Sequence, residues 1–168
     1  MWKSNEKYEH RCEKIQGDDM TEEILISVKG MHALEGDAQD DTVEVFSAGK
    51  YYFKNGKHYI FYEEIPTDGS GLVKNRITLQ DNWMEVQKKG AMNSTMTFET
   101  DKKHTSWYNT PFGNLMTGIE VTDMSMSEQE NLIEVCVDYA LEVNYERVAD
   151  SRIQIRVMAK DSGLFSLR

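Results

Sequence analysis

The sequence is poor in the residues that build disulfide scaffolds, and it lacks long apolar runs. Among its 168 residues there are two cysteines and two prolines, and no apolar stretch approaches the length of a membrane-spanning helix. Cys12 lies in a polar leader and Cys136 in a distant strand pattern, so we expect both to be free thiols. The leader also lacks the apolar core of a secretory signal. We therefore expect a cytoplasmic protein.

Basic residues are scarce relative to acidic ones, with 19 Lys and Arg against 29 Asp and Glu and a formal net charge of −10. A negative field repels phosphate groups, so this balance disfavours nucleic acids and anionic membranes as partners. Hydrophobic residues make up 39 % of the chain, which is enough for a core without disulfides or metals. The length fits one domain.

Familiar catalytic and metal-binding motifs are absent from the sequence. It has no Gly-rich phosphate loop, no nucleophile elbow, no paired-His metal motif and no Cys-x-x-Cys. The four histidines are scattered over separate segments: His10, His32, His58 and His104. We therefore predict no metal site and no cofactor, and we assign no catalytic residue.

Residues 1–19 form a charged, aperiodic leader that ends immediately before Met20. One hypothesis is that Met20 is the natural start, because codons for Gln16 to Asp18 can spell a purine-rich bacterial ribosome-binding site. The alternative is a short amphipathic helix from Ser4 to Ile15. Deleting residues 1–19 separates the two, since a large loss of thermal stability would make the leader part of the fold.

The most regular segment runs from Ile133 to Tyr145, where every second residue is apolar. Side chains on a strand alternate between the two faces of a sheet, so one face of this segment is predicted to be buried and the other solvated. The predicted buried set is Ile133, Val135, Val137, Tyr139, Leu141, Val143 and Tyr145. This pattern predicts a long antiparallel strand with one solvated face.

Short strand patterns separated by turns occupy the chain from Glu22 onward. Asn55-Gly56 is the strongest hairpin signal, because both residues tolerate the positive φ of a type I′ turn. Another turn is predicted at 48–50, and a single helical turn at Ser127 to Glu130. About ten strands with hairpin-length links result, with no helix long enough for a parallel crossover.

These short links predict an all-β fold, a single antiparallel up-and-down β-barrel of about eight to ten strands. We place the barrel domain at residues 20–160. The leader precedes it, and a C-terminal tail at 161–168 follows it.

Charges predict the register of the last two strands. Antiparallel pairing can align three acidic residues of one strand with three basic residues of the next. The aligned pairs are Glu142 with Arg152, Asp138 with Arg156 and Glu134 with Lys160. This register also places Tyr145 opposite Ala149, beside the turn.

Four local strings, taken together and in order, resemble one family of bacterial proteins. They are Tyr62-Glu63-Glu64, Lys88-Lys89-Gly90, Asn93-Ser94-Thr95-Met96-Thr97-Phe98 and Tyr108-Asn109-Thr110-Pro111-Phe112-Gly113. Over residues 20–160 the chain resembles the YwiB-like family, a domain of unknown function with a calycin, lipocalin-like β-barrel. The resemblance implies a barrel and an intracellular bacterial protein. It implies no activity, because the family has none assigned.

Lys88 is the most informative polar residue. It continues the face of Met84 and Val86, which we expect to be buried, so its ammonium is predicted at a barrel mouth near a carboxylate such as Glu64. Either the stem packs while the charge reaches water, or the charge anchors the acidic head of an otherwise apolar ligand. The candidate ligand-binding residues are Tyr62, Glu64, Lys88, His104 and Tyr108.

Six aromatic residues at strand positions are expected either to line an internal cavity or to fill it. They are Tyr59, Phe61, Trp83, Phe98, Trp107 and Tyr139.

Three functions are compatible with these observations. The first is a non-catalytic barrel that holds a small amphipathic molecule in its interior. The second is a solid barrel that binds a partner protein through its rim or outer face. The residues expected on that surface are Trp107, Phe112, Leu164, Phe165 and Leu167. The third is an enzyme built on a carboxylate such as Glu63 or Glu64.

Overall fold

The chain folds into ten antiparallel strands, seen in a computed structural model that describes residues 22–34, 41–91, 93–110 and 112–160. The strands are β1 (Glu22–Leu34), β2 (Asp41–Lys54), β3 (Lys57–Glu64), β4 (Val73–Gln80), β5 (Trp83–Gly90), β6 (Ser94–Glu99), β7 (Lys103–Thr110), β8 (Gly113–Gln129), β9 (Leu132–Val143) and β10 (Glu146–Ala159). In these ranges no helix has the length and apolar character needed to cross a membrane.

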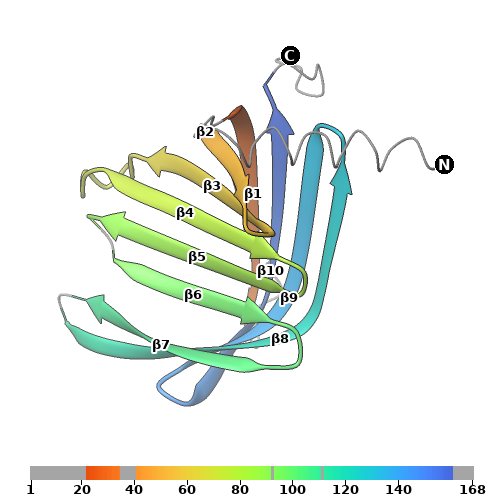
Figure 1. Cartoon of the computed structure of the whole chain (residues 1–168). Coiled ribbons are helices and arrows are strands. Elements are labelled where there is room, and N and C mark those ends of the chain that lie inside the picture. Colours follow the sequence, from red (N-terminus) through yellow and green to blue (C-terminus); the bar gives the residue numbers. More distant parts are fainter. Residues whose placement is uncertain (1–21, 35–40, 92, 111, 161–168) are drawn as a thin grey trace.

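The ten strands form one sheet in the order β6-β5-β4-β3-β2-β1-β10-β9-β8-β7. Nearly every strand pairs with its neighbours in the chain, and β1 pairs with β10 to join the two halves. The edge strands β6 and β7 follow one another directly in the sequence, so the sheet curls into a nearly closed barrel (Figure 1). The predicted up-and-down barrel of eight to ten strands is confirmed.

The core lies inside the barrel, where apolar side chains from successive strands meet. Phe98 of β6 and Tyr139 of β9 pack edge to face, with ring centroids 5.0 Å apart. The predicted alternation in β9 is confirmed from Ile133 to Tyr139. Tyr145, however, is 82 % exposed, because it lies in the turn that follows β9 rather than in the strand.

The Asn55-Gly56 hairpin is confirmed, with φ angles of 53° and 75° at the two residues. The turn predicted at 48–50 is wrong, because β2 continues through it. Gly49 has a different role there. A Cβ at this position would overlap the carbonyl oxygen of Phe61, so glycine allows β2 and β3 to approach closely.

The helical turn predicted at Ser127 to Glu130 is also wrong, because β8 remains a strand to Gln129. Its ladder with β9 gives the residues from Ser127 to Gln129 partners across the sheet, and Ser127 stands opposite Glu134. That pairing outweighs the local preference for a capped helical turn.

The predicted register of β9 and β10 is wrong by four residues. Arg152 stands opposite Asp138, and Arg156 stands opposite Glu134. Both pairs carry hydrogen-bonded ion pairs, at 2.6 Å for Arg152 Nε to Asp138 Oδ1 and 3.2 Å for Arg156 Nε to Glu134 Oε1. Acidic and basic residues recur every four positions on these strands, so the shifted register still aligns opposite charges.

The turn between the two strands decides this register. It is the pair Asn144 and Tyr145, with φ angles of 49° and 70°. The turn places Arg147 opposite Glu142, and a β-bulge between Arg147 and Ala149 then shifts the ladder by one residue, so that Ala149 stands opposite Leu141. The two charges left over by the shift find other partners: Lys103 pairs with Glu142, and Lys160 with Glu23.

Of the six aromatic residues expected in the interior, Phe98 and Tyr139 belong to the core. Tyr59 and Phe61 alternate with the buried residues of β3 and instead stack on Tyr52 at the outer face, with centroid distances of 4.8 and 5.6 Å. The expectation for these two is therefore wrong. Trp107 is 67 % exposed, and Trp83 is half-buried beneath the ammonium of Lys57.

Several predictions concern segments outside the described residues. They are the leader at 1–19 with Cys12, the helix proposed at Ser4 to Ile15, and the tail at 161–168 with its apolar residues. Cys136, within the described part of the chain, is a half-buried free thiol on the solvated face of β9.

Candidate functional site

Four polar side chains gather at the end of the barrel interior where β3 ends and β4 begins. Tyr62 on β3, Asn75 on β4 and Lys88 on β5 stand directly opposite one another across the sheet. Glu64 follows Tyr62 by two residues and so belongs to the same face. We call Tyr62, Glu64, Asn75 and Lys88 the head-group cluster.

Lys88 and Glu64 form the ion pair that the sequence predicted. The distance from Lys88 Nζ to Glu64 Oε2 is 3.2 Å. The two side chains are 27 % and 24 % exposed, so the pair is partly shielded from water. The charge of Lys88 is therefore compensated by a neighbouring carboxylate as well as by solvent.

Asn75 lies at the centre of this cluster and is 2 % exposed. Neither Nδ2 nor Oδ1 of its amide has a hydrogen-bond partner. A buried polar group without a partner costs about 1 to 3 kcal/mol, so such groups are uncommon unless they have a role. Asn75 was not predicted as a site residue. The alternation of Val73, Ile77 and Leu79 on β4 marks it as inward-facing, and that pattern is the signal that could have found it.

Tyr62 is also buried, at 5 % exposure. Burial raises the pKa of its phenol well above the ordinary value, and the nearby negative charge of Glu64 raises the pKa further. The phenol therefore stays protonated and keeps an O–H group available as a donor.

The structure brings Tyr62, Glu64 and Lys88 together, and it places the other two predicted site residues elsewhere. His104 binds Glu99 through Nε2 and Oε2 at 2.8 Å, beside the turn between β6 and β7. Tyr108 is half-buried on β7, opposite Leu115. Among the described residues, no hydrogen bond or ion pair joins Tyr108 to the head-group cluster.

Sequence reasoning also missed a second polar group inside the barrel, near the opposite ends of β3 and β4. His58 is 3 % exposed, and each of its two ring nitrogens forms a hydrogen bond. Its Nδ1 lies 2.8 Å from the hydroxyl of Tyr51, and its Nε2 lies 2.8 Å from Oε1 of Glu128. We call Tyr51, His58 and Glu128 the His58 clasp, because it connects β2 and β3 to the end of β8, which is not adjacent to them in the sheet.

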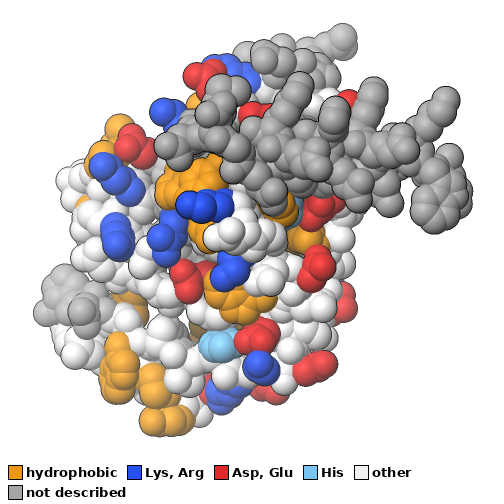
Figure 2. All heavy atoms as spheres, in the orientation of Figure 1, with side chains coloured by type: hydrophobic (Ala, Val, Ile, Leu, Met, Phe, Trp, Pro, Cys, Tyr) orange, Lys and Arg blue, Asp and Glu red, His pale blue; other side chains and the backbone are white. Residues whose placement is uncertain are grey.

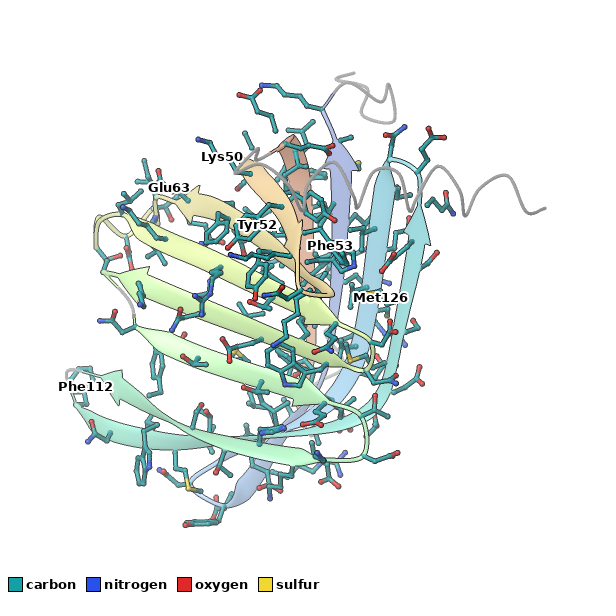
Figure 3. The ribbon with its side chains drawn as sticks, viewed as in Figure 1. Lys50, Tyr52, Phe53, Glu63, Phe112 and Met126 are labelled. Carbon is teal, nitrogen blue, oxygen red and sulfur yellow. The ribbon has the colours of Figure 1, made fainter. Side chains whose placement is uncertain are left out.

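The outer wall carries a groove of about 620 Å³ over β2, β3 and β4. Exposed side chains of Lys50, Glu63 and Lys74 contribute to its lining, and Figure 3 shows Lys50 and Glu63 near the upper ends of their strands. In Figure 2, Lys and Arg side chains gather mostly over β2 to β5, and Asp and Glu side chains mostly on the right of the view. Tyr62 and Asn75 also contribute to the lining of this groove, so it borders the head-group cluster at these two residues.

The described residues contain no group of three or more His, Cys, Asp or Glu side chains placed to hold a metal ion. Of the two carboxylates considered for catalysis, Glu64 is held by Lys88 and Glu63 is exposed on the outer face. The arrangement in the interior is thus one of hydrogen-bonding groups beside an ion pair, which suits binding of a polar head group.

Comparison with known proteins places the chain in a family. The chain is 25 % identical over 122 residues to the uncharacterized beta-barrel protein YwiB of Bacillus subtilis (strain 168), covering 71 % of this chain and 84 % of that protein. The crystal structure of the Bacillus subtilis protein superposes with a TM-score of 0.72 and 21 % identity, covering 83 % of this chain and 92 % of that one, which shows a shared fold. The family described as a domain of unknown function (DUF1934) matches residues 26–155. The chain therefore belongs to the DUF1934 family, a domain of unknown function, and it is similar to the β-barrel protein YwiB.

Proposed function

We propose that this protein is a non-catalytic, cytoplasmic barrel that binds a small amphipathic molecule. The polar head of the ligand is held by the head-group cluster, and its apolar part lies against the barrel interior. Partly buried apolar side chains that pack on the core, such as Val28, Met96 and Leu141, would supply that apolar wall.

The unpartnered amide of Asn75 is the observation that carries this proposal. Its two polar atoms are withdrawn from solvent and unpaired, while the neighbouring Lys88 and Glu64 satisfy each other. A bound head group would remove the free-energy cost of the unpaired amide, so part of the binding energy is already built into the free protein.

Native mass spectrometry of the protein purified from its own host tests the proposal. We expect a population whose mass exceeds that of the chain by one small molecule and which loses that mass on denaturation. The same measurement on an Asn75→Leu variant should show the bare chain. Protein from its own host that carries no small molecule, in several preparations, would contradict the proposal.

A second candidate function, binding of a partner protein, is favoured by the exposed aromatic residues near the edge of the sheet. Trp107 lies on the edge strand β7 and is 67 % exposed, and Phe112 follows at full exposure. Edge strands offer free backbone groups to an extended segment of another chain, and exposed aromatic residues are common at such contacts.

The same mass spectra distinguish this second function from the first. A partner would add the mass of a polypeptide, and a Trp107→Ser variant would lose that mass while keeping any small molecule. If the Trp107→Ser variant retained the polypeptide unchanged, the aromatic edge would not be the binding surface.

A further inference from the structure

We infer that the ligand's head group is uncharged and carries a hydrogen-bond donor beside an acceptor, as a carboxamide or a lactam does. This inference rests on the proposed function, because it names the chemistry of the molecule that the head-group cluster would hold. It follows from two independent features, the geometry of Asn75 and the balance of charge around it.

The Asn75 side chain offers one acceptor and one donor side by side, and both are unpaired. A ligand group that pairs with both atoms at once must place a donor against Oδ1 of Asn75 and an acceptor against Nδ2. A carboxamide edge does this with two parallel hydrogen bonds. A carboxylate has only acceptors, so it would place an acceptor against Oδ1 of Asn75. An ammonium has only donors, so it would place a donor against Nδ2.

The charges near Asn75 favour a neutral head for a separate reason. Lys88 stands directly opposite Asn75, and Glu64 lies 3.2 Å from the Lys88 ammonium. A carboxylate that approached Lys88 would also meet the negative charge of Glu64. An ammonium would meet the positive charge of Lys88. An uncharged head avoids both repulsions and leaves the partly shielded ion pair intact.

Tyr62 adds a third contact without changing this balance. Burial keeps its phenol protonated, so Tyr62 offers an O–H group from the strand position directly opposite Asn75. In the described part of the chain that hydroxyl has no hydrogen-bond partner. A carbonyl oxygen has two lone pairs, so a single carbonyl on the ligand can accept from both Asn75 Nδ2 and the Tyr62 hydroxyl.

Isothermal titration with three probes of equal chain length tests the inference: octanamide, octanoate and octylammonium. We expect octanamide to bind at least tenfold more tightly than either charged probe at neutral pH, because either charged probe would leave a buried polar atom of Asn75 mispaired. If octanoate or octylammonium bound most tightly, the neutral-head inference would be overturned while the proposed function stood. If none of the three bound and the protein from its own host carried no small molecule, both would fall.

Two variants sharpen the result, with a matched control. Asn75→Leu should weaken octanamide binding at least tenfold, and Glu64→Gln should narrow the preference for octanamide over octanoate, because it leaves the charge of Lys88 uncompensated. Gln87→Leu is the control, since Gln87 adjoins Lys88 on β5 but stands opposite Arg76 on the outer face. A Glu64→Gln variant whose ratio of octanamide to octanoate affinity equalled that of the parent, or a Gln87→Leu variant that lost octanamide, would overturn the inference even if Asn75→Leu failed to fold.

Discussion

His58 and Asn75 are both polar, both turned into the barrel and both almost fully buried, at 3 % and 2 % exposure. They lie near opposite ends of β3 and β4, where His58 stands opposite Leu79 and Asn75 opposite Tyr62. His58 has a partner on each ring nitrogen, whereas Asn75 has a partner on neither amide atom. The same barrel therefore holds one buried polar side chain whose hydrogen-bonding groups are all paired and one whose amide is unpaired.

This contrast separates stabilisation from binding. The His58 clasp joins strands that are not neighbours in the sheet, so its hydrogen bonds stabilise the closed form of the barrel. The head-group cluster leaves an amide unpaired and so gives up stability at that end. A cost of this kind is expected where a protein keeps hydrogen-bonding groups for a ligand.

The largest expected effect comes from breaking the clasp. His58→Ala removes a hydrogen bond to the buried Tyr51 hydroxyl and another to Glu128 and leaves a cavity, so we expect the free energy of unfolding to fall by about 2 to 4 kcal/mol. Urea denaturation measures it. His104→Ala is the matched control, because His104 also binds a glutamate but is 35 % exposed, and its loss should be much smaller. Equal losses in the two variants would remove the contrast between a structural and a surface histidine.

A smaller effect of opposite sign is expected at Asn75. Asn75→Leu replaces an unpaired buried amide with an apolar group of similar size, so the free energy of unfolding should stay the same or rise by about 1 to 2 kcal/mol. The same urea titrations measure it. A loss comparable to that of His58→Ala would show that the amide has partners and that the two ends of the barrel do not differ.

Tyr62 provides a pH-dependent test of the head-group end. Its folded pKa is raised by burial and then by Glu64, so its contribution to stability is present below the unfolded phenol pKa and is lost as the pH rises towards the folded value. Tyr62→Phe should therefore lose less stability than the parent chain when the pH rises above the ordinary phenol range. Melting temperatures across alkaline pH measure the difference. Identical alkaline profiles would mean that Tyr62 ionises freely and is not buried beside Glu64.

The smallest effect is expected on the outer wall, away from both ends. The Arg152 side chain hydrogen-bonds Asp138 and holds the pKa of that carboxyl below its usual range. The pair therefore contributes stability at neutral pH, and this contribution is lost as the pH falls through the lowered pKa. Asp138→Asn should be slightly less stable than the parent near neutral pH and equally stable in acid. A variant that differs from the parent equally at all pH values would contradict the observed pairing.

Much of the barrel could be predicted, because the relevant signals are local. The alternation from Ile133 to Tyr139 gives the buried face of β9, and Asn55-Gly56 gives a hairpin, each from adjacent residues alone. Lys88 could be placed beside Glu64 because both continue the inward faces of their strands. The register of β9 and β10 could not be fixed by charge, since charges repeated every four residues permit two alignments. The turn at Asn144 and the β-bulge after Arg147 together select one of them.

The polar interior could be predicted only in part. His58 and Asn75 are polar residues at positions where the strand alternation calls for an apolar one. Each therefore weakens the apolar pattern that would predict its own burial. The contact between His58 and Glu128 joins residues 70 positions apart, and it depends on how far the sheet curls. Whether Asn75 has a partner depends on every neighbouring side chain, and no local pattern contains that information.

Nitrogen-edited NMR of the Asn75 side-chain amide tests the central claim most directly. The Asn75→Leu variant assigns its two NH₂ signals, and octanamide is then titrated into the parent protein. We predict a saturable shift of the Asn75 signals while the ring signals of His58 stay in place. Asn75 signals that do not move at saturating octanamide, or a response confined to His58, would contradict the assignment of the binding end.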